Sequence, residues 1–517
     1  MIARKLNYVN ITFAAHMAVF GLVIFGILPR SVVPYWTILL AIFALWTPLE
    51  DSIAFFVRSI PFFIAIPITT EFDSFNMWRI MSGLIFLKWA WINRKEYRRC
   101  LNFKKLYQNR VAILLFALLG LSILSIAQAE SFGLAVKRIL YFINLSLIGI
   151  VIYNLTRKNA GFSERLIKNI AVPTIIVTLL GMIQLASVYF MDIFQFVDFW
   201  GGVVQRNLFG NLWADTAIKA NTWFAYFGDQ LSLRMFSIFP DSHSFPIFIL
   251  LGLPAVMALA IERVVKKSPE GLRAMLKTRA SLLVVFVPFI FLAAILSGTR
   301  GIWVAGLLVT IISIVFIPWF KHSHTNDPSL FAIFKYTSSY IVIFFILFGL
   351  AYYIMATDQF QMTKGNTAIL GKRVRSTIDI SETSNARRIE IWKDSIKSII
   401  KHPLLGVGIG NFPIVVDEDL AKAKAGSSAH NLYLHVAAET GIISLIIALW
   451  FLLTVIKKIL SNFIATNDNL TKTYFAVAIV SIPWVLIYSL TDVALFDERA
   501  FLFFVTTVAL TLGWQKT

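Results

Sequence analysis

The chain has 517 residues, of which 58% are hydrophobic and only 15% charged, and Lys and Arg outnumber Asp and Glu to give a net charge of +19. A soluble domain could not bury this much apolar side chain, so we expect a polytopic membrane protein. The positive-inside rule accounts for the basic charge, which lies in loops, and a nucleic-acid partner is therefore not expected. The single cysteine, Cys100, excludes an internal disulfide and a thiolate metal cluster.

Apolar runs near bilayer length recur along the chain, and each predicts a membrane-crossing helix. They lie at about 11–29, 35–49, 53–70, 77–92, 111–128, 134–155, 168–190, 243–262, 281–297, 301–319, 333–356, 441–460, 473–491 and 499–514. A span needs ~20 residues, so the shorter second and fourth runs could be tilted or re-entrant. We expect an all-α fold with about 12–14 transmembrane helices. The first run has no clear cleavage site, so we interpret it as a helix rather than a signal peptide.

The loop charges predict an orientation. Lys and Arg cluster in the loops after the fourth, sixth and eighth runs, which all fall on one side, whereas the opposite loops are acidic or neutral. The positive-inside rule then places both termini in the cytoplasm. The predicted organisation is a transmembrane region over 1–356 with outer loops at 191–242 and 298–301, a periplasmic loop at 357–440 and C-terminal helices at 441–517. Soluble nucleotide donors are not expected on that outer side, so group transfer there would need a membrane-carried donor.

The loop at 357–440 contains an amphipathic helix over about 386–401. Apolar side chains at steps of three and four predict one apolar face, formed by Ile389, Trp392, Ile396 and Ile399. Ser384 or Asn385 could cap its start, and Pro403 predicts an end near His402. The alternating glycines that follow predict a sharp turn, which could either cradle an anion or simply stop the helix; they are Gly406, Gly408 and Gly410.

Three arginines are candidate anion ligands. Arg300 lies in the short turn Gly298-Thr299-Arg300-Gly301 between two apolar runs, where a permanent charge is costly unless it is paired or used. Its planar fork suits phosphate, although it could also snorkel to lipid headgroups. Arg234 could supply a second cation or serve as an interfacial anchor, and Arg206 is a weaker candidate in the same outer segment.

His430 opens the apolar helix that leads back into the membrane. An imidazole with an ordinary pKa near ~6.5 can take a proton from a sugar hydroxyl at neutral pH, but a solvent-facing histidine near a helix start is the alternative.

A metal site is not expected. On a helix, His430 would lie well away from His435 and Glu439, so only the last two share a face, and two ligands make a poor zinc site. The acidic run Asp417-Glu418-Asp419 resembles a carboxylate metal motif but is better explained as a solvated turn.

Several spaced motifs together resemble the O-antigen ligase and polymerase superfamily. They are Arg388-x-x-Ile391-Trp392, His402-Pro403-Leu404-Leu405-Gly406-Val407-Gly408-x-Gly410-Asn411-Phe412, His430-Asn431-x-Tyr433-Leu434, Glu439-x-Gly441 and the Gly298-Thr299-Arg300-Gly301 turn. The resemblance implies a C-type glycosyltransferase of the bacterial inner membrane. Its donor would be a glycan on undecaprenyl pyrophosphate, its acceptor the lipid A core or another glycan hydroxyl, and it would need neither a cofactor nor a metal.

By position, the resemblance makes His430 the catalytic base and Arg300 a pyrophosphate ligand, with inversion at the anomeric carbon. Arg234 would be the second such arginine, although this chain has Asp241-Ser242-His243 where family members tend to have a Pro-Asn pair. Arg388 and Asn431 belong to the motifs as further substrate-binding candidates. Glu439 would either orient a histidine and shape the acceptor site or act as a structural carboxylate.

Three functions follow in order of preference. A ligase-like transferase comes first, an O-antigen or exopolysaccharide polymerase second, and a polysaccharide transporter or flippase third. Transport would call for ionisable residues deep in several helices, and only Arg58 and Lys137 fit that description.

Overall fold

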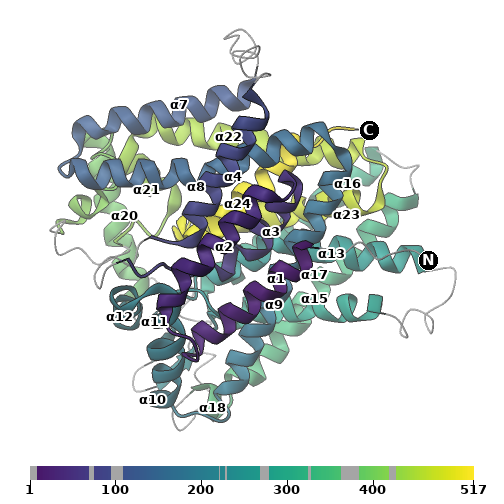
Figure 1. Cartoon of the computed structure of the whole chain (residues 1–517), viewed down its shortest axis with the longest axis horizontal. Helices are drawn as coiled ribbons and strands as arrows, with labels where there is room; N and C mark the ends of the chain where they lie inside the picture. The colour runs from purple at the N-terminus through teal and green to yellow at the C-terminus, as the bar shows by residue number, and fades with distance from the viewer. Residues whose placement is uncertain are drawn as a thin grey trace.

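The computed structural model describes residues 8–68, 75–94, 109–220, 222–227, 230–267, 279–323, 328–361, 383–418 and 427–516. Each predicted apolar run is occupied by a helix, and the expectation of an all-helical polytopic membrane protein is confirmed (Figure 1). The helices are α1 (Tyr8–Ile24), α2 (Val33–Trp46), α3 (Leu49–Ser59), α4 (Met77–Ile92), α7 (Arg110–Ser125), α8 (Phe132–Lys158), α9 (Ala160–Ser187), α13 (Ser244–Lys267), α15 (Arg279–Leu296), α16 (Arg300–Ser323), α17 (Pro328–Met355), α22 (Ile442–Ala465), α23 (Asn469–Tyr488) and α24 (Glu498–Gly513).

The helices differ in length. Among the described residues, six are long and apolar enough to cross a membrane, and five shorter apolar helices accompany them. The run predicted at 53–70 is only partly helical, because α3 ends at Ser59 and one 3-10 turn follows at Ile60–Phe62. Pro61 has no backbone N–H to donate to the Val57 carbonyl, which explains this early end. The chain continues as buried extended backbone, where Ala65 donates to the Leu208 carbonyl at 2.9 Å and accepts from Arg30 at 3.0 Å.

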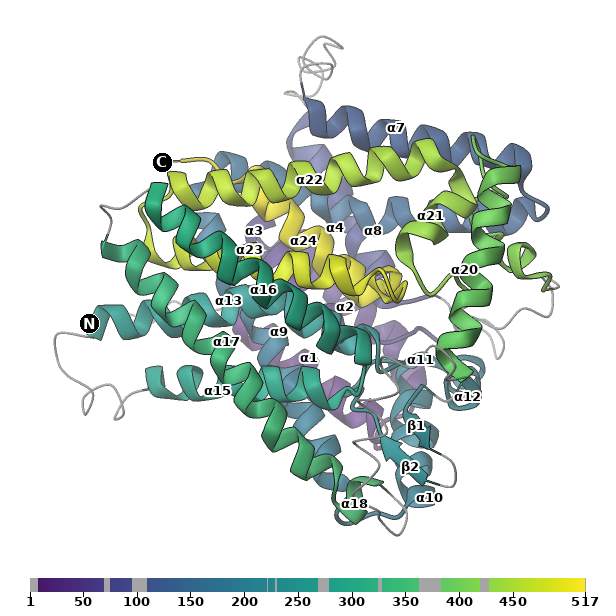
Figure 2. The same cartoon turned by 180° about the vertical axis from the view of Figure 1, so that it is seen from behind.

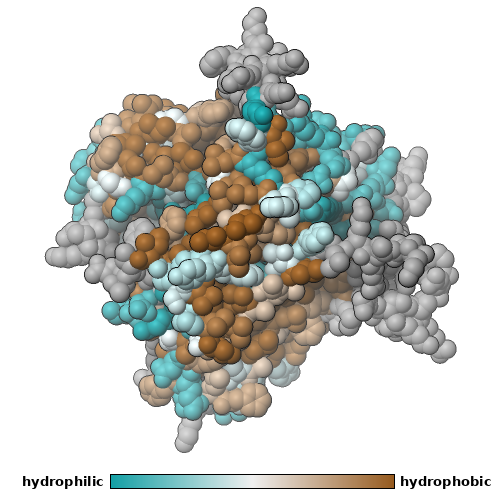
Figure 3. Space-filling model, in the orientation of Figure 1, coloured by the Kyte–Doolittle hydropathy of each residue, from teal (hydrophilic) through white to brown (hydrophobic). Residues whose placement is uncertain are grey.

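Helix α13 lies at the centre of the bundle. Its apolar window is completely buried, and it packs against α9, α15, α23 and α24. By contrast, α1, α2 and α7 expose apolar side chains such as Ile38, Leu45 and Phe116. Figure 3 shows hydrophobic side chains covering much of the face over these three helices. This pattern is expected of helices that face lipid, where exposed apolar side chains cost nothing.

The two ends of the bundle have different chemistry. At one end lie α20 (Thr383–Lys401), α21 (Leu432–Thr440) and the segment around residues 193–233, which we call the outer segment after its predicted side of the membrane (Figure 2). At the other end, Lys158 donates to Asn93 at 3.0 Å and Arg165 lies 3.7 Å from Glu50, so residues of separate basic loops meet there. The described chain ends also belong to this second end, because α1 runs from Tyr8 toward the outer segment and α24 runs away from it.

The outer segment contains a β-hairpin, and an isolated bridge between Ala65 and Asn76 is the other β-pairing in the described residues. After α10 (Ile193–Phe196), a π-helix (Val197–Gln205), α11 (Arg206–Phe209) and α12 (Asn211–Ala220), strands β1 (Phe224–Phe227) and β2 (Gln230–Leu233) form an antiparallel hairpin in which Phe224 pairs with Leu233. The hairpin ends immediately before Arg234.

The charged residues that the sequence placed deep in the membrane have different surroundings. Arg58 donates to Asn169 and to Asn10, so amide oxygens satisfy its guanidinium. Lys137 is exposed in the second turn of α8, at the helix end nearest to α20 and α21, so its deep placement was wrong.

Candidate active site

The loop between α23 and α24 carries a buried carboxylate that contacts two histidines. Asp492 is 6% exposed, and its Oδ2 atom lies 3.0 Å from His243 Nδ1 and 3.9 Å from His430 Nδ1. The first distance is a hydrogen bond, and the second is an ion-pair distance too long for one. Burial raises the pKa of Asp492, but the neighbouring imidazoles outweigh that effect and hold this pKa well below its ordinary value. Asp492 is therefore an anion shared between two imidazoles.

The backbone around His430 is fixed from two sides. Trp392 on α20 donates its indole N–H to the Ala429 carbonyl at 2.9 Å, and Leu432 donates its backbone N–H to the Ser489 carbonyl at 2.8 Å. His430 itself has a left-handed backbone, with a φ of +46°, which is uncommon for a residue with a side chain. Such a conformation persists only where the surroundings impose it.

The ring of His430 is partly accessible. Its side chain is 40% exposed, whereas its Nδ1 atom is buried beside Asp492 and has no hydrogen-bond partner. The accessible part of the ring is therefore the part that points away from Asp492. This is the arrangement expected of a histidine that meets a ligand on one side and a carboxylate on the other.

Arg234 is half-buried beside the same cluster. Its Nη2 atom lies 3.3 Å from His243 Nε2 and donates to Thr299 Oγ1, also at 3.3 Å. Burial lowers the pKa of Arg234 to about 10, with Arg388 and Arg300 adding to the effect and Asp492 opposing it, so the guanidinium stays charged at neutral pH. Its Nε atom is buried with no hydrogen-bond partner. Arg234 thus retains unused hydrogen-bonding capacity toward an anion.

Two further arginines complete the cationic group. Arg300 is the first residue of α16 and follows a turn in which Gly298 has a φ of +63°. The next residue, Gly301, packs so closely against the loop after α23 that a Cβ atom would lie 2.2 Å from Thr491 Oγ1. Arg388 reaches the group from α20, and both side chains act electrostatically on Arg234. Three guanidinium groups thus converge from three separate segments.

The other candidates from the sequence have structural contacts. Asn431 is the N-cap of α21, where its Oδ1 atom accepts the backbone N–H groups of Tyr433 and Leu434. Glu439 is 5% exposed and accepts the N–H of Phe412 at 3.3 Å, and its Oε1 atom lies 3.5 Å from His435 Nε2. Asn431 therefore sets the direction of α21 next to His430, while Glu439 holds the glycine turn against the same helix.

Four backbone amides in and beside the glycine turn donate to protein oxygens. Gly406 donates to the His402 carbonyl, Val407 to that of Ala438, Ile409 to Ser125 Oγ and Asn411 to the Gly408 carbonyl. Of the two hypotheses, the structural turn therefore has support in these hydrogen bonds. All three glycines have positive φ, and at Gly408 a Cβ atom would lie 2.5 Å from the Cα of Ala129.

Replacing Gly408 by alanine should therefore destabilise the protein. Left-handed backbone and the collision with Ala129 together should cost about 2 kcal/mol or more, which thermal unfolding in detergent would detect as a lower Tm. Gly120→Ala is the matched control, because it lies within α7 and no heavy atom lies within 4 Å of its Cβ position. Equal Tm values for the two variants would contradict this account of the turn.

Helix α20 differs from its sequence-based description in two details. It begins at Thr383, so neither Ser384 nor Asn385 is its N-cap, and it ends at Lys401 as Pro403 predicts. The face against the glycine turn and α21 carries Ile391 and Ile399, whereas Ile396 is 48% exposed. Ile396 therefore does not share the packed face with Ile399, and spacing alone does not distinguish an apolar residue that packs against protein from one that stays exposed.

The remaining candidates lie apart from the cluster. Arg206 forms an ion pair with Asp215 at 2.9 Å, so its charge is already neutralised. Asp417 is exposed and Glu418 accepts from Ser427, while Asp419 lies outside the described residues. In the part of the chain that the structure describes, no group of three potential metal ligands occurs.

Two central residues were not among the sequence candidates. His243 appeared only as part of a departure from the resembled motif, and Asp492 only as an acidic residue of an outer loop. Their signal was weak because the partners that reveal them are far away in sequence: His243 also hydrogen-bonds Tyr488 at 3.0 Å, more than two hundred residues later. Asp241 explains the local geometry, since it accepts the N–H groups of His243 and Ser244 at the start of α13.

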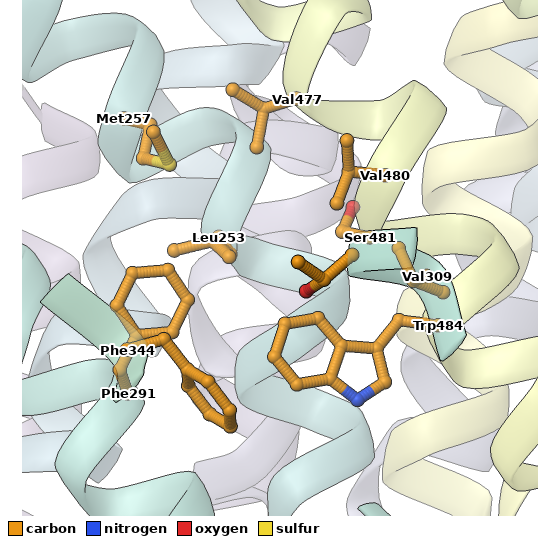
Figure 4. Close-up of a pocket in the computed structure, with 10 residues that line it drawn as sticks. Leu253, Met257, Phe291, Val309, Phe344, Val477, Val480, Ser481 and Trp484 are labelled. Atoms are coloured by element: carbon orange, nitrogen blue, oxygen red, sulfur yellow. The ribbon is translucent and has the colours of Figure 1, made fainter. Parts of the chain in front are cut away.

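The helices directly beneath the cluster are closely packed. Figure 4 shows Phe291, Phe344 and Trp484 around a small cavity of about 20 Å³, which is room for roughly one water molecule. A lipid chain does not fit there. Helix α16, by contrast, exposes Val304, Leu308 and Ile311 on the surface below Arg300.

Comparison with known proteins gives one family. The family described as O-antigen ligase matches residues 274–449, a range that includes Arg300, Arg388, Asn431, His430 and Glu439. No curated protein matches the chain.

Proposed function

We propose that this chain, whose residues 274–449 match the O-antigen ligase family of glycan-transferring enzymes, transfers a glycan from undecaprenyl pyrophosphate to an acceptor hydroxyl. The reaction would take place at the periplasmic face of the bacterial inner membrane. The observation that carries this proposal is that His430 lies beside Asp492, and that Arg234 is under the electrostatic influence of Asp492, Arg300 and Arg388. A base and an anion site side by side are what the displacement of a diphosphate by a hydroxyl requires.

The proposed reaction uses His430 as the base and the three arginines as the anion site. The acceptor oxygen attacks the anomeric carbon and forms the new glycosidic bond, while the bond from that carbon to the pyrophosphate oxygen breaks. His430 takes the hydroxyl proton on the accessible side of its ring. Arg234, Arg300 and Arg388 hold the pyrophosphate and stabilise the negative charge that develops as it leaves. Attack opposite the leaving group inverts the configuration, and no metal or cofactor takes part.

Asp492 and His243 are positioning residues in this scheme. The Asp492 carboxylate, ionised at any working pH, stabilises the imidazolium form of His430 after proton transfer. His243 links Asp492 to Arg234 through its two ring nitrogens, at 3.0 and 3.3 Å. Asp492 thus lies 3.9 Å from the base and is connected to the anion site through His243.

The donor lipid would approach from the membrane. Since the cavity beneath the cluster is too small for a prenyl chain, the chain would lie on the exposed apolar side of α16, below Arg300. Both termini would then be cytoplasmic, at the end where the basic loops gather.

The test is glycan transfer by the purified full-length protein in detergent, with a lipid-linked glycan as donor. Extension of lipid A core would identify a ligase, and extension of a second lipid-linked repeat unit would identify the polymerase alternative. If neither acceptor is glycosylated under conditions in which the protein is folded, the proposed function is wrong.

Replacing Asp492 by asparagine should lower kcat, because a neutral amide stabilises the imidazolium charge formed on His430 during proton transfer less than a carboxylate does. Initial rates over a range of donor and acceptor concentrations measure this effect. Asp417→Asn is the matched control, since it removes an exposed carboxylate. An unchanged kcat in the Asp492 variant would exclude its action through His430.

A further inference from the structure

A second pair of arginines lies outside the cluster described above. Arg79 and Arg138 stand over the same ring, that of Tyr141, with Cζ-to-centroid distances of 5.6 and 5.7 Å. Arg79 also lies 5.0 Å from the Trp78 ring, and Arg138 lies 5.4 Å from that of Phe142. Two like charges held against one aromatic platform repel each other, so this arrangement favours an anion between them.

Neither arginine has an anionic partner within the described part of the chain. Among the described residues, no carboxylate lies within 4 Å of either guanidinium. The nearby Glu498 already accepts hydrogen bonds from Asn76 at 3.0 Å and from the Trp78 indole at 2.7 Å. In addition, the Nε atom of Arg79 is buried with no hydrogen-bond partner. Stacking occupies the face of a guanidinium and leaves its N–H edge available, and both side chains are only partly buried.

The pair lies at the same end of the bundle as His430. Arg79 is in the first turn of α4 and Arg138 in the second turn of α8. Tyr141 donates to the Phe496 carbonyl at 3.0 Å, in the loop that carries Asp492, and Arg138 Cβ would lie 3.3 Å from a Cβ at Gly410. The pair is therefore enclosed between that loop and the glycine turn.

Aromatic contacts connect this second pair of arginines to α21, the helix that follows His430. The Phe142 ring, over which Arg138 lies, is 5.0 Å from the ring of Phe496. The Phe496 ring in turn lies 6.2 Å from that of His435 on α21. In the proposed mechanism Arg234, Arg300 and Arg388 hold the donor diphosphate. The second pair of arginines is then available to the acceptor.

We propose that Arg79 and Arg138 form an anion-binding subsite that takes a phosphate or carboxylate group on the acceptor saccharide and so orients its hydroxyl toward His430. This inference rests on the proposed function, and it adds a chemical class to the acceptor. Paired forks binding two oxygens each would also give the subsite a preference for phosphate.

Binding is measured first, without turnover. Purified full-length His430→Ala protein is titrated with a phosphorylated lipid A core glycolipid, with the same glycolipid after dephosphorylation, and with a phosphate-free glycolipid that carries a uronic acid. Adding Arg79→Gln or Arg138→Gln should weaken binding of the two anionic glycolipids about tenfold or more, because each removes charge-assisted hydrogen bonds. Binding of the dephosphorylated glycolipid should stay the same. A loss confined to one anionic glycolipid would assign the subsite to phosphate or to carboxylate.

Kinetics supplies the second measurement. In the otherwise unaltered protein, Arg79→Gln and Arg138→Gln should raise the acceptor KM and leave the donor KM unchanged. Arg94→Gln is the matched control, because Arg94 stacks on Trp91 at 4.2 Å near the other end of α4. If Arg79→Gln fails to fold, Arg79→Lys replaces it and should retain part of the affinity.

Equal weakening of the binding of charged and uncharged acceptors would overturn the subsite, and so would a raised donor KM in either variant. Binding of phosphatidylglycerol as tight as that of the glycolipid would also overturn it, because it would indicate an anchor for lipid headgroups. Glycolipid binding without any glycan transfer would instead refute the proposed function and leave the subsite intact.

Discussion

The His430→Ala variant should lose glycan transfer by a factor of about 10²–10⁴, the range that general base catalysis contributes. The ring is the one group in the cluster that combines an accessible side with a carboxylate behind it, and alanine removes the proton acceptor. Because the backbone around residue 430 is held by Trp392 and Ser489 rather than by the imidazole, the fold should survive the substitution. The measurement is the single-turnover rate with saturating donor and acceptor.

His402→Ala is the control for this experiment. His402 lies on the same outer loop, and its described contact to the glycine turn is made by its backbone carbonyl, so the side chain can be removed without breaking that contact. It should transfer glycan at the parental rate. Activity of His430→Ala within threefold of the parent would remove His430 from the mechanism, and the three arginines would then remain only as a binding site.

The Arg234→Gln variant should lower kcat by about 10²–10³, the cost of losing one preorganised donor to a developing anion. Glutamine keeps hydrogen-bonding capacity near Thr299 and His243 but removes the charge. Since the charge on the pyrophosphate grows as the sugar leaves, the loss should appear mainly in kcat and less in the donor KM. Initial rates over a range of donor concentrations separate the two.

Arg206→Gln is the matched control, because Arg206 belongs to the same outer segment and its partner is Asp215. Its transfer rate should equal that of the parent. A raised donor KM with unchanged kcat in Arg234→Gln would mean that this arginine binds the ground state only. An unaffected rate would exclude it from the site.

Much of the fold could be predicted because the hydropathy signal of a membrane span lies within one short stretch of sequence. Each apolar run became a helix, since in lipid a chain segment satisfies its backbone only by bonding to itself. The exceptions had local causes too: Pro61 ends α3 early, and the hairpin before Arg234 lies in the outer segment, where water and neighbouring strands can satisfy a backbone.

The candidate site was only half predictable. Arg300 was identified because a charge between two apolar runs is costly, and His430 because an imidazole can act as a base at neutral pH. The motif around Arg388 lies in the same predicted loop as His430. The structure adds His243 and Asp492 to them and gives Asn431 and Glu439 supporting contacts. Arg79 and Arg138 attracted no notice, since arginines near helix ends are common in membrane proteins.

The sequence by itself determined which segments enter the membrane, where the loops fall and which reactive groups those loops carry, because hydropathy and charge act over a few neighbouring residues. Only the tertiary structure decided which groups meet. Asp492 joins His243 to His430 across separate helices, and Tyr141 brings together two arginines from α4 and α8. Such contacts depend on how the helices pack, and packing is a property of the whole bundle that no single stretch of chain specifies.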